Sequence, residues 1–204
     1  MLVTIAGNIG SGKSTLTLLL HQAFGWQPHF ESVDDNPYLE DFYADMARWS
    51  FHLQVYFLSR RFITHKRITE WKGDAVQDRS IYEDAEIFAK NLFATGKMDE
   101  RDYRNYRALY DVMIPYLRLP DLLVYLRADV DTLQKQIALR GRPFERDLPR
   151  AYLEQLNTLY EEWVARYPGK LITIDVGEID FVHDNRNQEK LLHEIRLAAR
   201  PCHS

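Results

Sequence analysis

The residues most clearly suited to chemistry form the run Gly7-Asn8-Ile9-Gly10-Ser11-Gly12-Lys13-Ser14. Its spacing, G-x-x-x-x-G-K-[ST], is that of a P-loop, in which backbone N–H groups curl around phosphate oxygens. Glycines permit the curl, the following helix adds its positive dipole end, and Lys13 neutralises the β- and γ-phosphates. The Ser14 hydroxyl suits a Mg²⁺ ion that bridges those phosphates. The run, with Thr15 after it, therefore predicts an ATP site.

The surroundings of this run support that interpretation, because an apolar strand precedes it (2–6) and a helix follows it (14–24). A glycine-rich turn without a ligand is the alternative. A P-loop does not identify the phosphate acceptor, since ATPases, GTPases and small-molecule kinases all contain one.

Charged residues stand at the carboxyl ends of two further predicted strands. Glu31 is near the end of the second strand, His29–Ser32. Asp78 ends the third strand, Asp74–Asp78, and Arg79 follows it. Ligands of open α/β sheets bind at the carboxyl ends of the strands, so these residues should meet at the P-loop. There Glu31 can accept the proton of an attacking hydroxyl, Arg79 can hold the transferred phosphoryl group, and Asp78 can hold Mg²⁺ through water. The alternatives are a solvated loop residue for Glu31 and a surface ion pair for Asp78 and Arg79.

A helix over the region 47–58 is apolar on most sides and should be largely buried. Gln54 and Arg61 lie two turns apart on one face, which Phe51 and Leu58 share. Buried amide and guanidinium groups need partners, and a nucleobase would supply them. The alternative is an aromatic core helix in which Gln54 bonds to backbone.

The segment Arg140-Gly141-Arg142-Pro143-Phe144-Glu145-Arg146 combines three arginines with a glycine and a proline. We interpret 140–148 as a lid that closes over triphosphate and excludes water. A solvated basic loop is the alternative.

Strand and helix signals alternate along the chain, which predicts one α/β domain, 1–204, with a five-stranded parallel sheet flanked by helices. The remaining strands are expected at 122–126 and 171–175. Further helices are expected at 38–70, 81–94, 100–117, 130–139, 149–167 and 187–199.

Composition excludes several classes of protein. The net charge of −4 argues against a nucleic-acid-binding surface. No segment approaches the ~20 apolar residues of a membrane span. Cys202 is the only cysteine, so no internal disulfide can form, and we predict a cytoplasmic protein.

Together these motifs resemble the deoxynucleoside kinases, specifically the bacterial deoxyadenosine/deoxyguanosine kinases, from about Leu2 to Leu197. The resemblance depends on an ordered set: the P-loop, Glu31–Leu39, Phe42–Asp45, Phe51–Gln54 with Arg60-Arg61, Asp78–Asp84 and Arg140-Gly141-Arg142. It implies a P-loop kinase that uses ATP and Mg²⁺ to phosphorylate the 5′-hydroxyl of a deoxynucleoside. It favours a purine in nucleotide salvage and leaves deoxyadenosine and deoxyguanosine both open.

The resemblance also implies roles for individual residues. Glu31 is similar to the general base, and Arg79 to the residue that steadies the transferred phosphate. Gln54 and Asp84, with Arg61 beside them, resemble the readers of the base edge, and Tyr43 and Glu145 the ligands of the 3′-hydroxyl. Arg140 and Arg142 resemble the lid arginines, and the region 175–181 falls where the family holds the adenine of ATP. Helices over 45–69 and 100–117 imply a homodimer, with ordinary core packing as the alternative.

Two positions depart from the family pattern. Ser32 replaces the proline that usually follows the base glutamate, and Gln136 stands where animal members have an arginine.

Two other functions are alternatives to a deoxynucleoside kinase. A nucleoside monophosphate kinase, such as thymidylate kinase, would need cations for the acceptor phosphate, whereas the region 31–45 is acidic. A non-catalytic ATP-binding regulator would need no deep aromatic pocket.

Overall fold

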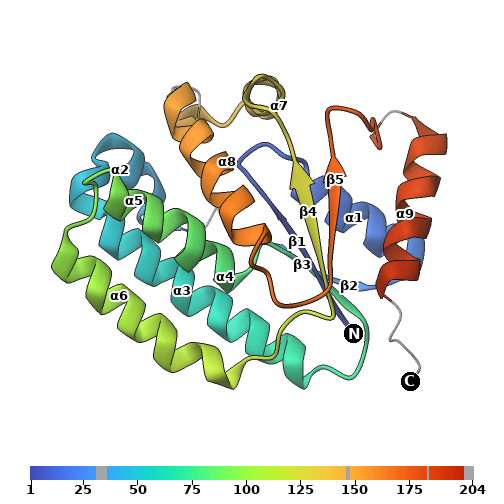
Figure 1. Cartoon of the computed structure of the whole chain (residues 1–204), viewed down its shortest axis with the longest axis horizontal. Coiled ribbons are helices and arrows are strands. Elements are labelled where there is room, and N and C mark those ends of the chain that lie inside the picture. The colour runs from blue at the N-terminus through green and yellow to red at the C-terminus, as the bar shows by residue number, and fades with distance from the viewer. Residues whose placement is uncertain (31–35, 146–147, 183, 200–204) are drawn as a thin grey trace.

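A parallel sheet forms the centre of the molecule in the computed structural model, which describes residues 1–30, 36–145, 148–182 and 184–199 (Figure 1). The strand order is β2-β3-β1-β4-β5, and every neighbouring pair is parallel. The predicted fold class, a five-stranded parallel sheet flanked by helices, is confirmed. The strands are β1 (Leu2–Gly7), β2 (Gln27–His29), β3 (Ala75–Asp78), β4 (Leu122–Arg127) and β5 (Leu171–Asp175).

Helices cover both faces of the sheet (Figure 1). On one face, α1 (Lys13–Phe24) and α9 (Asn185–Ala199) pack on the strands. The other face is covered by α3 (Met46–Glu70), α4 (Ile81–Glu83), α5 (Lys90–Ala94), α6 (Glu100–Met113), α7 (Val130–Arg140) and α8 (Arg150–Val164), and α2 (Leu39–Ala44) packs on α3. None of these helices, within the described ranges, has the length and apolar character needed to cross a membrane.

The central strands are buried on both faces, as parallel strands are when helices cover the sheet on each side. In β4, Leu122 and Val124 face the core beneath α1 and α9, whereas Leu123 and Tyr125 face the core beneath α8. This alternation follows from the two-residue period of a strand. The sheet is therefore rigid where the P-loop leaves it.

Several predicted boundaries are wrong, among them the end of α6 at Met113 and of α8 at Val164, and two others have a clear physical cause. The predicted helical region 38–70 is two helices, because Asp45 ends α2 and its side chain accepts a hydrogen bond from the Arg48 N–H at 3.0 Å, which caps α3. The second strand, expected at His29–Ser32, is Gln27–His29, where it pairs with β3. Glu31 and Ser32 lie outside the described residues, as does Cys202.

The predicted helix 81–94 is helical throughout, but its middle is irregular. Ser80 and Glu83 form a capping box that starts it, and the six residues Asp84–Ala89 are π-helical. A π-helical segment is rare and is often found at functional sites. This irregular helix carries several of the predicted site residues.

The arginine-rich segment leaves α7 at Gly141, which has a left-handed backbone with φ of 71°. A short 3₁₀ turn, Pro143–Glu145, follows, and residues 146–147 lie outside the described residues. Closure of this segment as a lid stays a prediction.

Gly25 ends α1 with a left-handed backbone, φ 69°, and its N–H donates to the His21 carbonyl. We expect Gly25→Ala to lower the free energy of unfolding by about 1 kcal/mol, because a Cβ disfavours this conformation. Urea denaturation measures the change. Gly25→Asn is the matched control and should lose less, since asparagine tolerates positive φ. Equal losses in the two variants would contradict this explanation.

Candidate active site

Parallel pairing of β1 with β3 places two functional turns side by side. Ile5 pairs with Asp78, and the Arg79 N–H donates to the Ile5 carbonyl at 3.0 Å. The P-loop then leaves β1 at Gly7, and Arg79 directly follows β3. The prediction that these segments meet at the carboxyl edge of the sheet is confirmed for the described residues.

The P-loop curls as the glycine spacing predicts. Gly10 has φ of 85°, and a Cβ there would lie 2.9 Å from the Leu133 carbonyl, so only glycine fits. Asn8 fastens the loop to α8, since its amide donates to the Leu153 carbonyl and to Asn157 Oδ1. Lys13 is buried, and its ammonium donates to the Asn8 carbonyl at 2.8 Å. The loop is therefore preorganised for an anion.

Ser14 and Asp78 are joined by a hydrogen bond of 2.5 Å between the hydroxyl and Oδ2. The other carboxylate oxygen, Asp78 Oδ1, is buried and has no hydrogen-bond partner in the described part of the chain. Mg²⁺ prefers such hard oxygen ligands and usually takes its others from water and nucleotide phosphates. No cluster of three or more His, Cys, Asp or Glu able to hold a metal occurs among the described residues. The pair therefore fits a Mg²⁺ ion that arrives with its nucleotide.

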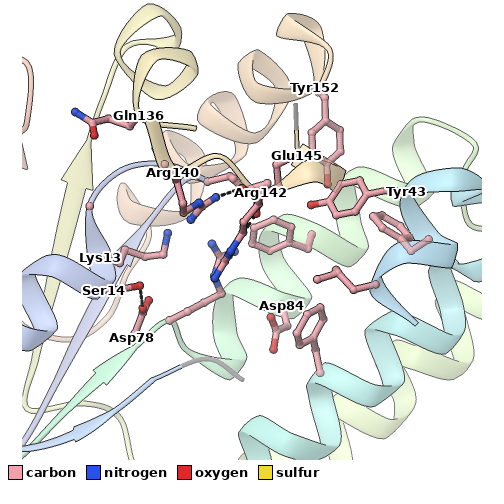
Figure 2. A pocket seen from close by; sticks show the side chains of 18 of the residues that line it. Lys13, Ser14, Tyr43, Asp78, Asp84, Gln136, Arg140, Arg142, Glu145 and Tyr152 are labelled. Atoms are coloured by element: carbon pink, nitrogen blue, oxygen red, sulfur yellow. Dashed lines mark hydrogen bonds and ion pairs between the residues drawn. The ribbon is translucent and has the colours of Figure 1, made fainter. Parts of the chain in front are cut away.

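A cavity of about 420 Å³ opens beside the P-loop. In Figure 2, Lys13, Ser14 and Asp78 lie at one end, Tyr43 and Asp84 at the other, and Arg140, Arg142 and Glu145 between them along one side. Its volume is in the range of small-molecule sites. Apolar and aromatic side chains supply the rest of the wall, among them Leu39, Phe42, Leu53, Phe57, Phe88 and Tyr152.

Polar groups stand at the end of the cavity away from the P-loop. Gln54 is 3% exposed, and its Oε1 has no hydrogen-bond partner among the described residues, so the expected bond to backbone is not seen there. Asp84 forms a buried ion pair with Arg61. Since a buried amide oxygen needs a donor, this end suits a ligand with hydrogen-bonding edges.

Arg79 is 5% exposed and Asp78 is 4% exposed, so neither belongs to a surface ion pair. The Arg79 backbone has a left-handed φ of 66°, and the guanidinium carbon lies 4.3 Å from the centre of the Phe88 ring. A strained backbone that is held by its surroundings often marks a functional residue. A guanidinium on the wall of the cavity, in the turn beside the P-loop, suits a phosphoryl group in transfer.

The arginine-rich segment contributes ion pairs to the side of the cavity. Glu145 is buried and pairs with Arg140 and, at 3.4 Å, with Arg142. The Tyr43 ring stacks on that of Phe144, the residue before Glu145, with ring centres 5.5 Å apart. Tyr152, also on the wall, has its pKa raised to about 12 by burial, so its hydroxyl remains a donor.

A second cavity of about 330 Å³ lies on the other side of the P-loop. It is bounded by Gly10, Gly12, Gln136 and the segment 176–182, whose Phe181 ring approaches Gly12. This is the region where the resemblance places the adenine of ATP.

Not every predicted site residue can be placed. Glu31 lies outside the described residues, whereas the P-loop residues, Tyr43, Gln54, Arg61, Asp78, Arg79, Asp84, Arg140, Arg142 and Glu145 are described, and most of them line one cavity. Sequence analysis missed Phe88, Tyr152 and the buried Glu83. Only Glu83 leaves a readable signal, the Ser-x-x-Glu spacing of a capping box.

The family model described as "Deoxynucleoside kinase" matches residues 3–199. The chain belongs to the deoxynucleoside kinase family. It is therefore an enzyme that phosphorylates deoxynucleosides, as predicted, and the alternatives of a monophosphate kinase and a regulator fall away.

Individual relatives of this deoxynucleoside kinase cover nearly its full length. It is 42% identical to the deoxyadenosine/deoxycytidine kinase of Bacillus subtilis, over 95% of this chain and 91% of that protein. It is 37% identical to a deoxyguanosine kinase of Lactobacillus acidophilus, over 95% of this chain and 88% of that protein. Among solved structures, this chain is similar to deoxyadenosine kinase from M. mycoides with the products dCMP and a flexible dCDP bound. The two structures superpose with a TM-score of 0.85 at 29% sequence identity, and the match covers 96% of this chain and 99% of that one.

We expect Lys13→Ala to raise KM for ATP about 10-fold or more, because a hydrogen bond to a charged group is lost. Calorimetric titration should show deoxynucleoside affinity within about threefold of wild type, since the polar end of the cavity is untouched. Lys90→Ala is the matched control, because Lys90 pairs with Glu162 away from both cavities. Equal loss of both affinities would contradict separate sites.

Proposed function

We propose that this kinase transfers the γ-phosphate of ATP to the 5′-hydroxyl of a deoxynucleoside, preferably a purine, in nucleotide salvage. One observation carries the proposal: a single cavity has the P-loop lysine at one end and the Asp84 carboxylate at the other, with the Gln54 amide also on its wall. A nucleoside that spans this length would present its sugar hydroxyl to the phosphate.

On the donor side, the P-loop residues Gly7, Asn8, Gly10, Ser11, Gly12, Lys13, Ser14 and Thr15 would hold the triphosphate through backbone N–H groups and the lysine. Ser14 and Asp78 would hold Mg²⁺, which supplies positive charge to the phosphates when bound. Arg140 and Arg142 would add cations from the lid.

On the acceptor side, Gln54 and Asp84 would read the base edge, with Arg61 orienting Asp84 through their ion pair. Tyr43 and Glu145 would bind the 3′-hydroxyl. Because Glu145 already pairs with both lid arginines, the sugar and the phosphate clamp would share one carboxylate. Arg79 would stabilise the charge on the phosphoryl group in transfer.

Glu31 is proposed as the general base. In the sequence it comes two residues after β2, which pairs in parallel with β3, the strand that Arg79 follows. A carboxylate there would take the proton of the 5′-hydroxyl as the new P–O bond forms.

The purine preference is supported by the sequence motifs Asp35-Asn36-Pro37-Tyr38-Leu39 and Asp78-Arg79-Ser80, which resemble the purine branch. The two relatives described above are consistent with it, since each is named as a kinase of a purine deoxynucleoside, and the B. subtilis protein also as a deoxycytidine kinase.

Two further proposals concern the state of the enzyme. Apolar side chains stand exposed on the neighbouring helices α3 and α6 and just beyond, namely Ile63, Leu109, Val112 and Tyr116. Such a patch supports a homodimer formed through these helices. A cytoplasmic location stays a prediction from the single cysteine.

The function is tested by incubating the enzyme with ATP and Mg²⁺ and each of the four deoxynucleosides or their monophosphates. We expect 5′-phosphorylation of deoxyadenosine or deoxyguanosine with the highest kcat/KM, and none of the monophosphates. Activity should vanish when EDTA removes the metal. Phosphorylation of the monophosphates alone would overturn the proposal, and deoxycytidine as the best acceptor would overturn the purine preference.

We expect Glu31→Gln to lower kcat about 10²-fold or more while deoxynucleoside affinity stays within about threefold, because only proton transfer is impaired. Steady-state kinetics and calorimetric titration separate the two effects. Glu40→Gln, an exposed acid on α2, is the control. A near-wild-type kcat in Glu31→Gln would remove Glu31 from the mechanism.

A further inference from the structure

A completely buried carboxylate joins the two turns of the active site. Glu83 is 0% exposed and does not line either cavity. Its Oε1 accepts from the Gly7 N–H at 3.3 Å, and its Oε2 accepts from the Ser80 N–H at 2.7 Å. Gly7 begins the P-loop, and Ser80 directly follows Arg79. One side chain therefore connects the donor cradle with the turn that carries Arg79.

Tyr160 on α8 completes the connection. Its hydroxyl lies 2.8 Å from Glu83 Oε1 and 2.8 Å from the Gly7 carbonyl oxygen. The Gly7 N–H is thus held by Glu83, and the single hydroxyl hydrogen of Tyr160 is shared between the Gly7 carbonyl and the carboxylate. Asn8, the next residue, is held by the same helix through Leu153 and Asn157.

Helix capping alone does not explain this arrangement. The capping box uses Oε2, which accepts from the Ser80 N–H and hydroxyl. Oε1 is not needed for the cap, yet it bonds to groups that lie 76 and 77 positions away in sequence. Every group in contact with the two oxygens can donate a hydrogen bond, which is how a buried carboxylate is stabilised.

We propose that Glu83 is a positioning residue for phosphoryl transfer, which fixes the P-loop at the correct distance from Arg79 and the acceptor. The inference rests on the proposed function, because alignment matters only if a nucleoside hydroxyl must meet the γ-phosphate. Asp84, the next residue, faces the acceptor end of the cavity, so Glu83 also ties the acceptor side to Gly7. Misplacement of reacting groups by about 1 Å can cost 10²-fold in rate.

The variant Glu83→Gln keeps the shape of the side chain but turns an NH₂ group toward donors at one of the two turns. We expect kcat for deoxynucleoside phosphorylation to fall at least about 10-fold, with KM for the deoxynucleoside within about threefold of wild type. The ratio of ADP formed to deoxynucleotide formed should rise, because attack by water needs no aligned acceptor.

Tyr160→Phe should change kcat and this ratio in the same direction by a smaller factor. The double variant should be no worse than Glu83→Gln alone, since the two residues act as one unit. Glu86→Gln is the matched control on the same helix: it loses the 2.8 Å ion pair with Arg107 and should keep the wild-type kcat and ratio. If Glu83→Gln does not fold, Tyr160→Phe tests the proposal by itself.

A wild-type kcat in the folded variants, or an unchanged ratio of ADP to deoxynucleotide formed, would overturn the inference. Glu83 would then be a capping residue that affects only the midpoint of thermal unfolding. Strictly additive losses in the double variant would overturn it as well. A wild-type enzyme that phosphorylates no deoxynucleoside would instead sink the proposed function, so the two failures are distinguishable.

Discussion

The pairing of β1 with β3 is the interaction on which the rest of the site depends. Adjacent parallel strands lie about 4.8 Å apart, so the register Ile5 to Asp78 fixes where the P-loop and the Arg79 turn begin relative to each other. The contacts that cross this pair, Ser14 with Asp78 and Gly7 with Glu83, are possible only in that register. Slippage by one residue would send Asp78 to the opposite face of the sheet.

Electrostatics explains why charged groups can be buried around the cavity of a chain whose net charge is −4. Arg61 pairs with Asp84, and Arg140 and Arg142 pair with Glu145, so these charged side chains of the site neutralise one another. Buried charges are tolerated when they are paired and hydrogen-bonded. A triphosphate that enters would compete with Glu145 for Arg140 and Arg142.

The parts of the structure that sequence analysis predicted well are those whose causes are local. The P-loop is specified by glycines and a lysine within eight consecutive residues, and α1 ends where Gly25 allows a left-handed turn. The strands β1, β3, β4 and β5 were assigned to within one residue at each end, because parallel strands inside a sheet are continuous apolar runs. Gln54 and Arg61 were found because helical periodicity places them on one face.

What sequence analysis missed depends on contacts between distant segments. The break at Asp45 and the start of β2 at Gln27 are decided by a side-chain cap and by pairing with β3. Phe88 beneath Arg79 and Tyr152 in the cavity wall look like ordinary core aromatics in the sequence. Glu83 reads as a capping residue, and its bonds to Gly7 and Tyr160 depend on the packing of α8.

The π-helical segment and the short helix before it shape one wall of the cavity. In a regular α-helix, successive side chains diverge by about 100° around the axis, so few consecutive residues can all be buried and contact different parts of the protein. Here Glu83 points to the P-loop, Asp84 faces the cavity and Phe88 supports Arg79, although all three are buried on one short stretch. The wider turn of Asp84–Ala89 changes the direction of the side chains that follow it. One irregular helical segment thus contacts the P-loop, lines the cavity and supports Arg79.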